Sequence, residues 1–134
     1  MISLLELAKY DMRTAQLVIT TNTDEGAIRH GAYLTQQAVE KTLKFILSEL
    51  RQTYPLTHNI QDLVVKLNGL GIEIPSEIVG MALVLTSWEA KSRYAGNFSA
   101  NFKQVSQAIR IANEFILDIE KAHVDGLLKI NNNI

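Results

Sequence analysis

The chain has 134 residues with 13 basic and 14 acidic side chains, which gives a formal net charge of −1. This length favours a single domain that buries enough surface to fold without a covalent or metal staple. The balanced charge excludes a global basic field for nucleic acid. The absence of cysteine excludes disulfides and cysteine-ligated metal sites.

The cellular setting is predicted from the N-terminus and from the apolar runs. The first residues lack the basic start and the small-residue cleavage site of a signal peptide. No apolar stretch approaches the ~20 residues that a membrane span needs. We therefore predict a cytoplasmic protein that makes no membrane contact.

Two helices are expected in the first 52 residues. Ser3 and Glu6 form a possible capping box ahead of an amphipathic run that ends near Thr21. Asp24 is a plausible N-cap for a long second helix over about residues 25–52.

Three shorter segments follow the break that Pro55 imposes. A third helix is expected over about residues 58–67, with Thr57 or Asn59 as its cap. Pro75 suits the first turn of a fourth helix over about residues 76–94, and Ser99 is a possible cap for a fifth helix that ends near Val124. No convincing strand remains, so long helices with short connections predict a bundle of antiparallel neighbours over residues 1–126. Residues 127–134 are predicted to fray.

The long central helix carries a narrow polar stripe. At 100° per residue, Gln37, Lys41 and Lys44 fall within about 60° of one another, with apolar residues on both flanks. Such a stripe can hold two cations in a groove where a phosphate would bind. The alternative is an ordinary solvated face, on which Glu40 and Lys44 form an exposed pair worth ~0.3 kcal/mol.

Several motifs together resemble the HEPN family. Its most recognisable segment is matched by Gln36-Gln37-Ala38-Val39-Glu40-Lys41, followed by Leu43-Lys44 and Leu47. Further features agree in order and spacing: Ala8 and Asp11 in the first helix, Thr57-His58 after the break, and Ser92-Arg93-Tyr94 at the end of the fourth helix. The resemblance spans about residues 5–120, which is almost the whole chain.

The resemblance implies an all-α, up-and-down bundle of about five helices, like the substrate-binding subunits of nucleotidyltransferases, and usually a homodimer. Members are implicated in nucleotide binding, and many are encoded beside a minimal nucleotidyltransferase in a two-gene, toxin–antitoxin-like module. We therefore expect an accessory protein rather than an enzyme. Its ligand would be an ATP-like or GTP-like nucleotide or RNA, and its partner a minimal nucleotidyltransferase. No cofactor, metal or catalytic residue is expected.

The predicted ligand site takes its phosphate-binding cations from the central stripe and from the end of the fourth helix. It comprises Gln37, Lys41, Lys44, His58, Arg93 and Tyr94. A structural role is the alternative for each of the last three. His58 can bond local backbone in its turn, Arg93 can pair with Glu89 one turn earlier, and Tyr94 can pack at a helix end rather than stack on a base.

Two rival functions remain open. Some branches of the family are metal-independent ribonucleases that use an Arg followed four to six residues later by a His. Here no histidine follows Arg93, and the pair Arg51 and His58 straddles the break at Pro55, so we interpret that spacing as coincidence. The other rival is a helical interaction module without a ligand, which the apolar flanks of the central helix suit equally well.

Overall fold

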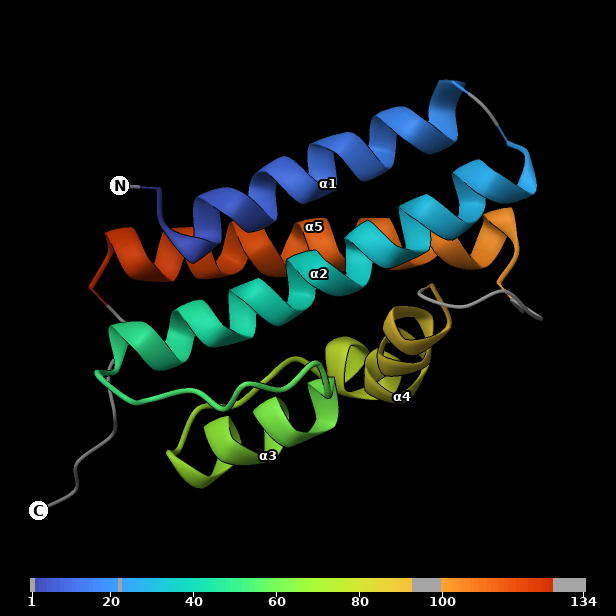
Figure 1. The fold of residues 1–134 in the computed structure, drawn as a ribbon. Helices are drawn as coiled ribbons and strands as arrows, with labels where there is room; N and C mark the ends of the chain where they lie inside the picture. The colour runs from blue at the N-terminus through green and yellow to red at the C-terminus, as the bar shows by residue number, and fades with distance from the viewer. Residues whose placement is uncertain (1, 22, 93–99, 127–134) are drawn as a thin grey trace, which may run out of the picture.

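Residues 2–21, 23–92 and 100–126 are described by this computed structural model of the chain. They form five helices and, within these ranges, no strand: α1 (Leu4–Thr21), α2 (Glu25–Glu49), α3 (Ile60–Gly69), α4 (Ser76–Ser92) and α5 (Phe102–Val124). The long helices α1, α2 and α5 pack on one another, α3 lies beside α2, and α4 is seen nearly end-on (Figure 1). The predicted all-α bundle of about five helices is confirmed.

Local sequence signals set most helix starts. The Ser3 hydroxyl accepts a hydrogen bond from the Glu6 N–H at 3.1 Å, and the Asp24 carboxylate accepts one from the Ala27 N–H at 2.8 Å. Both bonds satisfy amide groups that have no partner inside the helix. The predicted caps at the starts of α1 and α2 are therefore in place.

The start of α5 differs from the prediction. The expected cap, Ser99, lies outside the described residues, and the helix begins at Phe102 with Asn101 as its N-cap. Asn101 and Gln104 form a reciprocal capping box, in which each side chain accepts from the other residue's N–H. This box, rather than the serine, fixes the start of the helix.

The end of α2 is also earlier than expected, at Glu49 instead of Gln52. The Arg51 N–H donates to the Ser48 carbonyl and the Gln52 N–H to the Leu47 carbonyl, which is the closure of a Schellman turn. Arg51 takes a φ of 59° to make this turn, a left-handed conformation that glycine usually supplies. The helix thus stops at its own turn before Pro55 can interrupt it.

The core forms around α2, which packs against all four other helices. Fully buried apolar side chains from four helices meet there: Met12, Leu43, Ile46, Leu47, Leu63, Ile78 and Leu85. Two ion pairs join α1 to its neighbours, Lys9 with Glu120 of α5 and Lys41 of α2 with Asp11. The hydrogen bond to Glu120 raises the pKa of Lys9. Among the described helices, none combines the length and apolar character that crossing a membrane requires.

Gly31 lies at a close approach between α1 and α2. A Cβ atom at this position would lie 2.7 Å from Cγ2 of Ile19 and 3.5 Å from Cγ1 of Val105. Ile19 is itself only 4% exposed, so its methyl group has little room to move away. The packing of α1 on α2 therefore depends on the missing side chain.

We predict opposite effects of adding a methyl group at Gly31 and at Gly69. Gly31→Ala should lower the free energy of unfolding by about 1–3 kcal/mol, because it overpacks the contact with Ile19. Gly69 ends α3, and a Cβ atom added there would meet no other atom within 4 Å. Gly69→Ala should therefore raise stability by about 0.4–1 kcal/mol by restricting the unfolded chain. Urea denaturation measures both, and a gain at Gly31 would contradict the packing argument.

Candidate functional site

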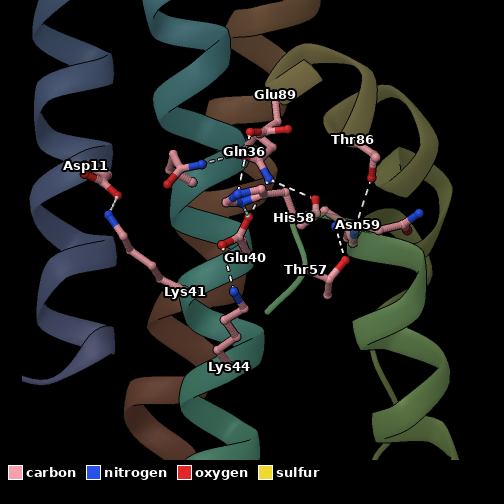
Figure 2. Close-up of polar contacts among 12 residues, drawn as sticks. Asp11, Gln36, Glu40, Lys41, Lys44, Thr57, His58, Asn59, Thr86 and Glu89 are labelled. Carbon is pink, nitrogen blue, oxygen red and sulfur yellow. Dashed lines mark hydrogen bonds and ion pairs between the residues drawn. The ribbon is translucent and has the colours of Figure 1, made fainter. Parts of the chain in front are cut away.

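Three polar side chains of α2 follow one another at four-residue spacing and are buried. Gln36 is 0% exposed, Glu40 5% and Lys44 9%. The spacing places them on one side of the helix, and Figure 2 shows that side facing His58 and α4. Buried charge of this kind requires partners, because desolvation of an unpaired ion is costly.

The Glu40 carboxylate is the acceptor that holds this cluster together. Its Oε1 atom accepts from Nε2 of Gln36 at 2.9 Å and lies 3.0 Å from Nδ1 of His58. Its Oε2 atom accepts from Nζ of Lys44 at 3.0 Å. An ionised carboxylate can only accept, so Nδ1 of His58 carries the proton in this bond. One buried carboxylate therefore fixes three side chains.

His58 reaches Glu40 because the start of α3 is anchored on both sides. The Asn59 N–H donates to the Thr57 hydroxyl, and the Asn59 side chain caps α3 by accepting from the Asp62 N–H. The Ile60 N–H donates to Oγ1 of Thr86 on α4. Of the two predicted caps, Asn59 is the N-cap and Thr57 supports it, while α3 begins at Ile60 rather than at His58.

The imidazole of His58 lies between two buried carboxylates but remains half exposed. Its Nδ1 atom bonds Glu40, whereas its Nε2 atom lies 3.9 Å from Oε1 of Glu89 on α4. The side chain is 50% exposed, against 6% and 8% for the two glutamates. Its backbone carbonyl accepts from Nε2 of Gln36 at 3.3 Å. The ring is thus held at both backbone and side chain while one edge faces solvent.

The predicted site residues do not all come together. Lys44 and His58 meet at Glu40, but Lys41 extends toward α1, where its amine pairs with Asp11 (Figure 2). Gln37 is half-buried and donates from Nε2 to the Gln36 side chain at 2.7 Å. The two lysines therefore do not share one groove, contrary to our expectation from the helical stripe.

Two further predicted site residues, Arg93 and Tyr94, lie outside the described residues. In the sequence they follow Glu89 by about one turn of helix, and Glu89 is itself a member of the cluster. Their place at the site stays a prediction.

The pair between Glu40 and Lys44 forms as the spacing predicts, but it is not exposed. The side chains are 6% and 11% exposed, and the ammonium of Lys44 also lies 5.7 Å from the centre of the Tyr54 ring. The loop that carries Tyr54 and the start of α3 cover this side of α2. The interpretation of the stripe as a solvated face is therefore wrong for these two residues.

Sequence reasoning did not recognise Glu40, Gln36 and Glu89 as members of the site. A signal was present for Gln36, since at 100° per residue it falls about 20° from both Leu43 and Leu47, in the middle of an apolar face. A polar residue in that position needs a buried partner. Glu89, by contrast, gave no signal, because its spacing predicts a pair with Arg93 one turn later.

The cluster places hydrogen-bond donors and acceptors at fixed positions around His58. Among the residues that the structure describes, no three His, Asp or Glu side chains are grouped as a metal ion would require. The Nε2 atom of the half-exposed His58 ring can accept a hydrogen bond when the ring is neutral and donate one when it is charged. The arrangement can therefore bind a polar group or transfer a proton at one fixed position.

We predict that Glu40→Ala lowers the free energy of unfolding by about 3–5 kcal/mol, because it leaves the buried Lys44 ammonium without its carboxylate. Lys41→Ala on the same helix is the matched control, since its pair with Asp11 is partly exposed and should be worth less than about 1 kcal/mol. Urea denaturation at neutral pH compares the two variants. Equal, small losses would show that Glu40 does not hold the cluster together.

Comparison with known proteins agrees with this architecture. The chain matches the HEPN domain family over residues 1–122. The crystal structure of TT1696 from Thermus thermophilus is similar, with a TM-score of 0.71 and 22% identity over 88% of this chain and 94% of that one. That likeness concerns the fold. A search of curated proteins finds no match. The family match extends over nearly the whole described bundle, and this chain therefore belongs to the HEPN domain family.

Proposed function

We propose that this protein is a HEPN-type nucleotide-binding accessory subunit that acts as a homodimer beside a minimal nucleotidyltransferase. The ligand site in this proposal is the surface around the half-exposed His58 ring, between α2 and the start of α3. The observation that carries the proposal is the half-exposed His58 ring held by the buried Glu40 carboxylate. The partner enzyme and the two-gene, toxin–antitoxin-like setting are included in the proposal because the chain belongs to the family, and many of its members are encoded beside such an enzyme.

The energetics of the cluster favour a binding role over a purely structural one. Two buried charges and a buried amide seldom stabilise a bundle more than apolar side chains of similar volume would. What the cluster achieves is a fixed orientation of one solvent-facing imidazole edge. Buried groups that orient an exposed polar group in this way are characteristic of ligand sites.

The ion pairs decide which predicted residues can meet a phosphate. Lys41 and Lys44 each already bind a carboxylate, so little of their charge is available to an anion. In the proposed site Arg93 therefore supplies the main positive charge, because its guanidinium can bind two phosphate oxygens at once, and the His58 ring contributes one hydrogen bond rather than a free charge. In the same proposal Tyr94 stacks on the base, and Gln37 lies at the edge of the site.

We predict that ATP or GTP raises the melting temperature of the wild-type protein. A ligand that binds only the folded state, at about 100 times its dissociation constant, adds about 2.7 kcal/mol of stability. His58→Ala and Arg93→Ala should each reduce the shift. His30→Ala is the matched control, because His30 is an exposed histidine on α2 and should leave the shift unchanged. No shift with any nucleotide would refute the proposal.

A second function, a metal-independent ribonuclease, is favoured by one observation. The carboxylate of Glu40 fixes the Nδ1 proton of His58, which leaves Nε2 available as a general base or acid. In such a reaction Nε2 would take the proton of a ribose 2′-hydroxyl as that oxygen attacks the adjacent phosphorus and the bond from phosphorus to the 5′-oxygen breaks. The products would be a 2′,3′-cyclic phosphate and a 5′-hydroxyl, whose oxygen takes its proton from water.

This candidate is tested with RNA and the wild-type protein in the presence of a chelator. Cleavage by the wild type that is abolished in His58→Ala and retained in His30→Ala would replace the binding proposal with the ribonuclease. If all three proteins leave RNA intact, the accessory role is favoured.

A further inference from the structure

The Nε2 atom of the half-exposed His58 ring lies beside a carboxylate oxygen of Glu89. The two atoms are 3.9 Å apart, which is too long for a direct hydrogen bond. Figure 2 shows the ring between the carboxylates of Glu89 and Glu40. Because the Nδ1 proton is already bonded to Glu40, a neutral ring presents Nε2 as an acceptor next to an oxygen that also accepts. A ligand group that reaches both atoms would therefore be held at two points.

The hydrogen-bonding needs of this pair of atoms are not met by a phosphate oxygen. Such an oxygen only accepts, so it can form no hydrogen bond with the Glu89 carboxylate and would place an anion against it. Lys44 does not offset this, because it bonds Oε2 of Glu40, and that carboxylate lies between the ammonium and the ring (Figure 2). An ammonium group on a ligand only donates, and the charged form of the ring would repel it. The pair requires a group that both donates and accepts.

Two neighbouring hydroxyl groups meet this requirement in either form of the ring. A hydroxyl oxygen forms hydrogen bonds of about 2.7–2.8 Å, so one placed between two atoms 3.9 Å apart reaches both. When the ring is charged, a hydroxyl accepts from the Nε2 proton and donates to Glu89. When the ring is neutral, one hydroxyl donates to Nε2 and its neighbour donates to Glu89. A carboxylate offers about four acceptor positions, so Glu89 can take this bond in addition to its contacts within the protein.

We propose that Nε2 of His58 and Oε1 of Glu89 bind the 2′- and 3′-hydroxyls of the ribose, so that the site takes ribonucleotides and rejects nucleotides that lack these groups. The inference rests on the proposed function and assigns the part of the ligand that these two residues meet. An acidic side chain binds a ribose hydroxyl in the same way in dinucleotide-binding folds, and a contact of this kind distinguishes ribose from deoxyribose. The phosphates are left to Arg93, the main cation of the proposed site.

The first test compares ligands on the wild-type protein. Isothermal titration calorimetry measures the dissociation constant of ATP or GTP, whichever gives the larger melting shift, and that of its 2′,3′-dideoxy analogue. The analogue should bind roughly 10- to 100-fold more weakly, because it removes hydrogen bonds to a charged group. The 2′-deoxy and 3′-deoxy analogues then assign the loss to one hydroxyl or to both, and at least one of them should bind more weakly than the parent nucleotide.

The second test asks whether Glu89 is the residue that recognises the ribose. Glu89→Gln keeps the shape of the side chain but removes its charge, so its hydrogen bond to a hydroxyl weakens. The ratio of the two dissociation constants, dideoxy analogue over parent, should fall by roughly threefold or more. A purely structural role of Glu89 would change both constants by the same factor and leave the ratio unchanged. Glu77→Gln on the same helix, with a side chain that is 56% exposed, is the matched control and should keep the wild-type ratio.

Several outcomes would overturn the inference. A dideoxy analogue that binds as tightly as its parent would do so while leaving the proposed function intact. A ratio that Glu89→Gln leaves unchanged, or that Glu77→Gln lowers equally, would also overturn it. If neither ATP nor GTP binds, the proposed function fails and the inference fails with it, so the two failures are distinguishable. The ligand series on the wild type decides the question even if Glu89→Gln does not fold.

Discussion

The Glu40 carboxylate is the constraint on which the rest of this site depends. It is buried on the central helix and accepts hydrogen bonds from Gln36, His58 and Lys44. Because an unpaired carboxylate in such a position would cost several kcal/mol, its burial depends on these donors. The same carboxylate that Lys44 and Gln36 pair with inside the bundle also holds the His58 ring. The contacts that stabilise the fold therefore also orient the side chain at the proposed site.

This constraint explains why an irregular segment can carry a fixed side chain. His58 precedes α3, in a stretch with no helical hydrogen bonds of its own, and loops of this kind usually hold side chains loosely. Here Thr57 and Asn59 order the start of α3, and Thr86 ties that start to α4. The Gln36 amide then holds the His58 carbonyl against α2. Three helices thus position one residue that belongs to none of them.

The elements that could be predicted from the sequence are those set by local chemistry. Hydrophobic periodicity predicts the five helices and the spacing of buried residues on α1. Capping signals predict the N-caps Asp24 and Asn59. Two of the boundaries that were wrong, at Glu49 and Phe102, depend on a left-handed arginine and on the capping box that Asn101 forms with Gln104. Such details arise from competition between neighbouring signals, which a single sequence does not resolve.

The site was less predictable because its residues act through tertiary contacts. The stripe of Gln37, Lys41 and Lys44 follows from helical geometry alone, which gives the direction of each side chain but not what covers it. Asp11 draws Lys41 toward α1, and Glu40 draws Lys44 toward α3, so neighbours on one stripe serve different contacts. The burial of Glu40 and Lys44 depends on where α3 and α4 lie, and a helical wheel of α2 does not show the positions of other helices.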